Sequence, residues 1–250
     1  YLHVTTNGFL TDRIVEFCET RDRRLPLMLL VSLDGVGAKH DAVRGVAGAW
    51  EKATRTLQAL APRRKELHLT LAVNQTIVDA EGGAQYLALR EVLAPLQIRN
   101  HAVIAYDQSA TYSTAETLEV APREIGSFLS FGALPRERVT ALLDAFTADL
   151  PQYALPERLA KAYYYRGIRN RLLHGTGDPN PPCVALSTHL RMYPNGDVPV
   201  CQFNSTRLGN LAETPFAELW HGERARQLRA WVHRCPGCWA ECEVLPNAIY

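Results

Sequence analysis

Cysteine supplies the clearest chemistry in this sequence, because five of the six cysteines lie in the last third of the chain. These five are Cys183, Cys201, Cys235, Cys238 and Cys242. The last three have the spacing C-x2-C-x3-C, and the Pro236-Gly237 pair favours a tight turn that aims two sulfurs at one centre. Four thiolates suit either a structural zinc ion or an iron–sulfur cluster. We therefore predict one shared metal site, and the spacing alone does not choose the metal.

A disulfide framework is the alternative use of clustered cysteines. Such frameworks occur mainly in small secreted domains that cannot build a hydrophobic core, whereas a chain of 250 residues can build one. In a cytosolic protein the same clustering more often indicates metal or redox chemistry. The sixth cysteine, Cys18, lies on a predicted helix between Phe17 and Glu19, so we interpret it as a packed thiol outside the metal site.

Two predicted elements must position the metal-site cysteines. Asn195-Gly196 is a strong hairpin signal, and it predicts a hairpin over residues 190–201 that brings Cys183 and Cys201 close together. Apolar residues at helical spacing then predict one helix over residues 214–232, directly before Cys235. Upstream of this module, the sequence predicts helices over 121–131, 136–150 and 156–173, and a linker over 174–182.

The first half of the chain alternates between predicted strands and helices. The strands are expected over 2–6, 27–33, 67–75 and 98–106, and the helices over 11–21, 46–60 and 83–94. This order is typical of a parallel sheet or barrel with helices outside it.

Polar residues follow several of these strands, notably Ser32, Asp34 and Asn74. Each one alone is compatible with an ordinary turn. In parallel α/β folds, however, chemistry is concentrated where the strands end, so their recurrence favours a site.

The overall charge excludes some classes of partner. The chain has 27 basic and 26 acidic residues, so we expect no nucleic acid and no anionic membrane as partner. The longest apolar run, residues 25–33, is shorter than the roughly 20 residues needed to cross a bilayer. Because Tyr1 is followed by a predicted strand rather than a signal-like leader, we expect a cytoplasmic protein and a truncated chain.

Two segments of the sequence resemble the radical S-adenosylmethionine (SAM) family. The phrase from Thr5 to Leu10 is similar to the third barrel strand of that family, and the phrase from Val31 to Gly45 is similar to its fourth strand and the loop after it. The resemblance implies an α/β fold with a partial (β/α)6 barrel that lacks its first strands.

The last segment resembles the SPASM/twitch extensions of the same family. Cys183, Gly196 and Cys201 fit the cysteine–glycine–cysteine element of these extensions, and two further phrases, 208–211 and 218–220, follow in the expected order. The resemblance therefore divides the chain into a partial barrel (1–120), a helical insert and linker (121–182), and an iron–sulfur module (183–250).

This sequence departs from the family pattern in three ways. It contains no C-x3-C-x2-C motif for the catalytic cluster and no glycine-rich second strand, so we expect a fragment that does not cleave SAM as it stands. It has five module cysteines, fewer than a two-cluster SPASM module needs, which favours one auxiliary [4Fe–4S] cluster. Gln202 stands where anaerobic sulfatase-maturating enzymes have an aspartate base, which argues against that activity.

For the complete enzyme, the resemblance implies an oxidoreductase or maturase of the radical SAM type. Such an enzyme cleaves SAM reductively to a 5′-deoxyadenosyl radical, which abstracts hydrogen from a peptide or small-molecule substrate. It uses a second [4Fe–4S] cluster and an electron donor such as flavodoxin or ferredoxin. The SAM contacts would be Ser32, Asp34, Arg44 and Asn74, of which Arg44 is equally compatible with a surface loop. The competing hypothesis is a non-catalytic zinc-ribbon binding module fused to an inactive α/β domain.

Overall fold

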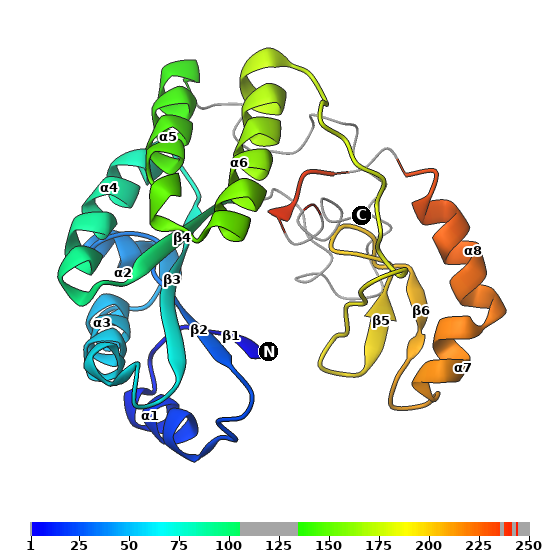
Figure 1. Cartoon of the computed structure of the whole chain (residues 1–250), viewed down its shortest axis with the longest axis horizontal. Helices are drawn as coiled ribbons and strands as arrows, with labels where there is room; N and C mark the ends of the chain where they lie inside the picture. The colour runs from blue at the N-terminus through cyan, green and yellow to red at the C-terminus, as the bar shows by residue number, and fades with distance from the viewer. Residues whose placement is uncertain (1, 106–134, 236–237, 242–243, 245–250) are drawn as a thin grey trace. The chain divides into compact units, whose positions relative to one another are not determined.

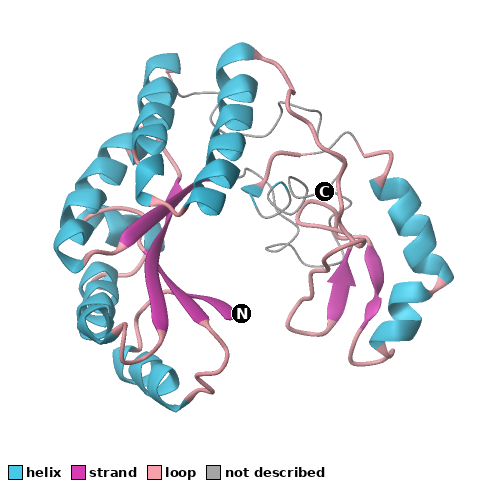
Figure 2. Ribbon diagram, in the orientation of Figure 1, coloured by secondary structure: helices cyan, strands magenta, loops and turns pink. Residues whose placement is uncertain are grey.

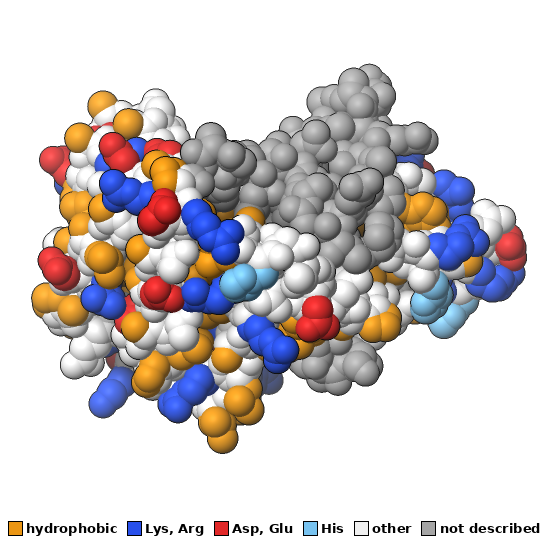
Figure 3. Space-filling model, turned by 90° about the horizontal axis from the view of Figure 1, so that it is seen from above, with side chains coloured by type: hydrophobic (Ala, Val, Ile, Leu, Met, Phe, Trp, Pro, Cys, Tyr) orange, Lys and Arg blue, Asp and Glu red, His pale blue; other side chains and the backbone are white. Residues whose placement is uncertain are grey.

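The computed structural model describes residues 2–105, 135–235, 238–241 and 244. The chain divides into two compact units, Tyr1–Ala105 and Tyr106–Tyr250, and each is described here by itself. Lys and Arg side chains intermingle with Asp and Glu side chains on the described part of the face in Figure 3. None of the described helices is long and apolar enough to cross a membrane.

The first unit is built on a four-stranded parallel sheet. Its strands are β1 (Leu2–Thr6), β2 (Leu27–Ser32), β3 (Leu69–Ile77) and β4 (Arg99–Ile104), in the order β1-β2-β3-β4. Three helices follow the strands along the chain: α1 (Thr11–Thr20), α3 (Ala49–Leu60) and α4 (Gly82–Leu93). Figure 1 shows these helices along one side of the sheet. The predicted α/β fold with a parallel sheet is confirmed.

The strands alternate between two faces, and one face is strongly apolar. Leu29 and Val31 of β2 lie level with Leu71 and Val73 of β3, and all four join a buried core that includes Leu57 of α3. Burial of such side chains is worth about 1.5–3 kcal/mol each, which ties the helices to this face. Cys18 of α1 is fully buried in the same core, and burial raises the pKa of its thiol. This confirms that Cys18 is a packed thiol.

The connection between β2 and α3 contains a further helix, α2 (Ala38–Arg44), which the sequence analysis did not predict. Gly37 and Gly45 flank this helix with φ values of 58° and 66°, which favour glycine. Gly48, with φ 73°, comes directly before α3, and this is why α3 begins at Ala49 and not at residue 46.

The second unit begins in the described residues with two helices, α5 (Arg136–Ala148) and α6 (Leu155–Arg169). A short π-helix, η6 (Asn170–His174), extends α6. Phe146 of α5 packs against Tyr165 of α6, with ring centroids 5.4 Å apart. Both helices were predicted, whereas the helix predicted over 121–131 lies outside the described residues.

The cysteine-rich part contains a two-stranded antiparallel sheet of β5 (Asp197–Pro199) and β6 (Arg207–Asn210). The predicted turn is present, because the N–H of Tyr193 donates to the carbonyl oxygen of Asp197 at 2.8 Å. The prediction of a hairpin over 190–201 is nevertheless wrong in its strand pairing, because β5 pairs with β6 and not with the residues that precede the turn. The amide of Asn210 explains this, since its Nδ2 donates to the Asn195 carbonyl at 3.0 Å and to Asp197 Oδ1 at 2.9 Å.

The helix predicted over 214–232 is two helices, α7 (Phe216–His221) and α8 (Glu223–Val232). They are separated at Gly222, whose backbone is extended with ψ 169°. Leu219 of α7 and Leu228 of α8 share a buried core with Val198 and Leu208 of the small sheet. Figure 2 shows this arrangement of two helices beside two strands.

Candidate functional site

The first group of predicted site residues lies at the carboxyl edge of the parallel sheet, meaning the ends of β2 and β3 and the residues that follow them. Ser32 and Asn74 are partners in the strand register, so their side chains point to the same face of the sheet. That face is opposite to the one that carries Val31 and Val73 into the helical core. The structure therefore brings Ser32 and Asn74 together, as the sequence predicted.

Asp34 is the central side chain of this edge, and it is only 3% exposed. Its Oδ2 lies 2.7 Å from Nε of Arg44, and its Oδ1 accepts a hydrogen bond from the N–H of Thr76 at 2.9 Å. One carboxylate thus connects the end of β2 to β3 and to α2. Arg44 lies in a helix and pairs with Asp34, so its interpretation as a surface residue of a loop is wrong.

Sequence reasoning missed His40, which is fully buried on α2. Its Nδ1 accepts a hydrogen bond of 3.0 Å from the N–H of Asp34, which requires a neutral imidazole with its proton on Nε2. Burial lowers the pKa of His40, and this effect outweighs the opposing influence of the Asp34 carboxylate. His40 therefore fixes the backbone from which the Asp34 side chain projects. No sequence signal marked it, because burial on a seven-residue helix depends on tertiary packing.

Asp41, the neighbour of His40, holds the turn between α2 and α3. Its carboxylate accepts hydrogen bonds from the N–H groups of Gly48 at 2.7 Å and Trp50 at 2.8 Å. These bonds lower the pKa of Asp41. The Trp50 ring in turn meets the His40 ring at 6.4 Å in an edge-to-face arrangement. The carboxyl edge is thus braced by α2 and by the start of α3.

The side chains of this edge are suited to binding a polar ligand. A hydroxyl at Ser32, an amide at Asn74 and the carboxylate–guanidinium pair of Asp34 and Arg44 offer both donors and acceptors of hydrogen bonds. Such groups suit a ligand that carries hydroxyl, ammonium or carboxylate groups.

The second group of predicted site residues is the set of cysteines. Cys183 and Cys201 both pack against the core that contains Val198 and Leu228. The N–H of Phe203 points at Cys201 Sγ from 3.4 Å, which stabilises negative charge on that sulfur. None of the described cysteines takes part in a disulfide. Cysteines that remain thiols, one of them receiving a backbone N–H bond, fit a thiolate-bound metal group.

The remaining cysteines follow α8. Cys235 and Cys238 are half-buried, and Cys242 lies outside the described residues. Within the described ranges, no three Cys, His, Asp or Glu side chains are grouped as a metal site. The convergence of Cys183, Cys201, Cys235, Cys238 and Cys242 on one metal therefore stays a prediction.

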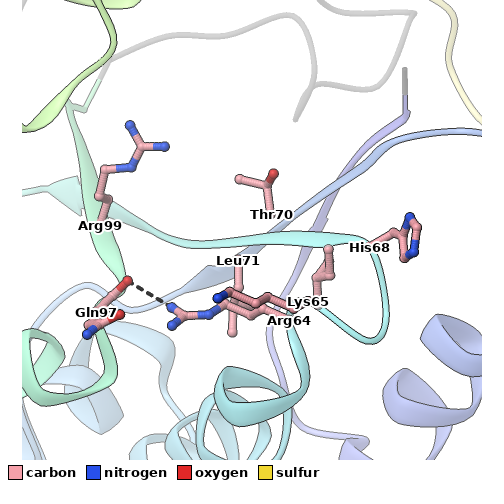
Figure 4. A pocket seen from close by; sticks show the side chains of 8 residues that line it. Arg64, Lys65, His68, Thr70, Leu71, Gln97 and Arg99 are labelled. Carbon is pink, nitrogen blue, oxygen red and sulfur yellow. Dashed lines mark hydrogen bonds between the residues drawn. The ribbon is translucent and has the colours of Figure 1, made fainter.

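A basic pocket lies at the opposite, amino end of β3 and β4 (Figure 4). Its volume is about 530 Å³, and its lining includes Lys65, His68 and Arg99. Arg64 extends across it and donates to the carbonyl oxygens of Leu96 and Gln97 at 2.9 and 2.8 Å. The pocket contains none of the predicted site residues.

Comparison with known proteins gives a family match for the cysteine-rich part and a sequence relative for most of the chain. Residues 183–242 match the SPASM family, which is described as an iron-sulfur cluster-binding domain. The pre-heme d1 synthase of Dinoroseobacter shibae is 27% identical over 225 residues, which cover 83% of this chain and 53% of that protein. The chain thus spans about half the length of this curated relative.

Solved structures show the same fold. Native anSMEcpe with bound AdoMet matches with a TM-score of 0.53 and 15% identity, over 91% of this chain and 58% of that chain. The structure of native anSMEcpe with AdoMet and the Kp18Cys peptide matches with the same TM-score and identity, over 91% and 59%. These relatives are radical SAM enzymes. The expected resemblance to radical SAM enzymes with a SPASM extension is confirmed.

Proposed function

We propose that this chain is part of a radical SAM enzyme whose residues 183–242 hold one auxiliary [4Fe–4S] cluster. The observation that carries the proposal is the family match, which begins at Cys183 and ends at Cys242. These are the first and last of the five cysteines predicted as ligands. Four of Cys183, Cys201, Cys235, Cys238 and Cys242 would hold the cluster, and the fifth would be spare.

We propose that the carboxyl edge contributes to binding SAM through Ser32, Asp34, Arg44 and Asn74. Asp34 is suited to this role because His40, Arg44 and Thr76 fix its backbone and both carboxylate oxygens. The Arg44 guanidinium has donors besides Nε, so it can pair with Asp34 and still meet a ligand carboxylate. In the proposed whole enzyme, SAM bound to a catalytic cluster would take up one electron and give methionine and a 5′-deoxyadenosyl radical for hydrogen abstraction. The residues of this chain position the ligand and exclude water.

The substrate would be a peptide or a small molecule. The sequence relative is a pre-heme d1 synthase, and the anSMEcpe structures include peptides. Gln202, which is buried, cannot act as the base that sulfatase-maturating enzymes use, so we propose a different reaction. A one-electron donor such as flavodoxin or ferredoxin would complete the system, which we place in the cytoplasm. The match to an iron-sulfur family makes the zinc-ribbon alternative the less favoured one.

The test is the longer protein encoded in the same reading frame. We expect a C-x3-C-x2-C motif upstream of Tyr1 and, after anaerobic reduction with dithionite, release of 5′-deoxyadenosine from SAM. The S32A and N74A variants should bind SAM more weakly and should keep their iron. A longer reading frame without that motif, or a reduced protein that releases no 5′-deoxyadenosine, would contradict the proposal.

A further inference from the structure

The C-terminal cysteine segment is held against α6 and η6 by three side chains. Trp239 is fully buried, and its Nε1–H donates to the carbonyl oxygen of Tyr164 at 2.8 Å. Glu241 pairs with Lys161 at 3.2 Å. The guanidinium of Arg171 lies over the Trp239 ring, 4.0 Å from its centroid. Because Trp239 directly follows Cys238, these contacts fix the backbone next to a predicted cluster ligand.

Arg171 is a buried cation that has no carboxylate partner among the described residues. It is 6% exposed and donates hydrogen bonds to the carbonyl oxygens of Gly167, Gly177 and Pro179 at 3.2, 2.6 and 3.0 Å. Among the described residues, no carboxylate lies within ion-pair distance of it. Lys161, the neighbouring buried cation, has Glu241 as its partner. A buried charge normally requires an opposite charge nearby, since water no longer solvates it.

Cys238, the residue directly before the Trp239 that Arg171 covers, can provide that opposite charge as a thiolate. Burial lowers the pKa of Arg171, whereas the negative charges of Tyr163, Cys238 and Asp178 raise it. Of these three groups, only Cys238 belongs to the predicted ligand set. A cysteine that binds a cluster does so as a thiolate. Cys238 would therefore carry a negative charge beside Arg171 whenever the cluster is bound, in place of the carboxylate that Arg171 does not have.

We propose that Arg171 is the counter-charge of the Cys238 thiolate and that its positive charge makes the auxiliary cluster easier to reduce. This inference rests on the proposed function. In the reduction, one electron passes from an external one-electron reductant to the cluster, and no bond forms or breaks. The cluster therefore gains one negative charge, which a fixed positive charge beside it stabilises. Burial strengthens the effect, because the interaction is screened less than it would be in water.

The test is the reduction potential of the cluster, measured by anaerobic redox titration of the whole protein with electron paramagnetic resonance detection. At the midpoint potential of the wild-type protein, the ratio of reduced to oxidised cluster in R171Q should be lower by on the order of tenfold. R171K keeps the charge and should stay close to the wild-type potential. R229Q is the matched control, because Arg229 also lies over a tryptophan, Trp220 at 4.5 Å, and also donates to a carbonyl, that of Leu186 at 2.6 Å. It should leave the potential unchanged.

The outcomes separate this inference from the proposed function. A wild-type protein without iron and sulfide would overturn the proposed function itself. A full cluster content with equal potentials in wild type and R171Q would overturn only the role of Arg171. If R171Q loses the cluster while R171K keeps it at the wild-type potential, the positive charge is required, as proposed. If R171K loses it too, or shifts as far as R171Q, the residue acts by packing and the proposal is wrong.

Discussion

The carboxyl edge of the sheet and the cysteine module differ in how the charges of their candidate site residues are balanced. At the edge, Asp34 and Arg44 neutralise one another at 2.7 Å, and His40 fixes the backbone beside them. Against the module, the buried Arg171 of η6 has no carboxylate partner among the described residues, and it lies beside Trp239, which follows Cys238. At the edge, the charges of the protein side chains balance one another. At the module, the positive charge of Arg171 is left to be balanced by a bound group, such as a cluster with its thiolate ligands.

The largest expected difference between the two regions is in iron binding. C201A should lower the iron content of anaerobically purified protein from about four per chain to near zero. We expect Cys201, which receives the N–H bond of Phe203, to be one of the four ligands that a cubane requires and not the spare cysteine. C18A is the matched control, because Cys18 is buried in the helical core of the first unit. It should keep its iron. Iron content measured by colorimetric assay decides this, and an unchanged content in C201A would exclude Cys201 as a ligand.

Removal of the metal group should separate the stabilities of the two regions. A chelator under reducing conditions should abolish the slow hydrogen exchange of β5, β6 and α8, since ligand binding stabilises only the folded module. The amides of β2 and β3 should keep their protection, because their core contains no predicted ligand. Hydrogen exchange with mass spectrometry measures both at once. Equal loss of protection in both regions would mean that the sheet depends on the metal too.

The ion pair of the edge should contribute a smaller but measurable amount. D34N should lower the opening free energy of the β2 and β3 amides by about 2 kcal/mol, less than for a fully buried pair because the Arg44 side chain is 31% exposed. D22N is the matched control, since Asp22 pairs with Arg24 at the exposed surface, where water screens the attraction between the two charges. Hydrogen exchange of these amides measures the effect. If D34N and D22N lowered the opening free energy by the same amount, the Asp34–Arg44 pair would stabilise the sheet no more than a surface pair does.

The smallest expected effect is the pH dependence due to His40. Its folded-state pKa lies below its ordinary value, so protonation favours the unfolded state. The stability contributed by neutral His40 is complete above about pH 6.5 and is lost as the pH falls from there towards the lowered pKa. The loss is at most about 1.4 kcal/mol for each pH unit.

H40N is the test variant, because its side-chain oxygen keeps an acceptor near the position of Nδ1. We expect the stability difference between wild type and H40N to shrink between pH 7.5 and 5.5, as measured by hydrogen exchange of β2. The charged groups near His40 are Asp34, Asp41 and Arg44. Of these, Asp41 has a lowered pKa because its carboxylate accepts hydrogen bonds from the N–H groups of Trp50 and Gly48, so it stays charged over this pH range. A difference that is constant over this range would contradict the account.

The sequence predicted the sheet well because each strand is a short apolar or alternating run between turn residues. It predicted Ser32, Asp34 and Asn74 as neighbours for the same reason, since parallel strand ends meet at one edge. It missed helix α2, because a helix of seven residues is too short to be stable without packing such as that of His40. Local patterns identify which segments are strands, and packing decides the short helices between them.

The module was harder to predict from local signals. Asn195-Gly196 indicated the turn correctly, but a turn does not specify the partner of β5, which Asn210 helps to fix from 13 residues away. Gly222 interrupts a continuous apolar stripe, so α7 and α8 were read as one helix. Arg171 gave no signal at all, because burial of a cation beside a cysteine segment that is distant in sequence depends on the tertiary fold.

The most direct test of the central claim is an assay of iron, acid-labile sulfide and zinc on protein purified without oxygen, together with its visible spectrum. We predict about four iron and four sulfide per chain and the broad brown absorbance of a cubane cluster. One zinc per chain, with no sulfide and no colour, would contradict the account and would identify the module as a zinc-stabilised binding domain.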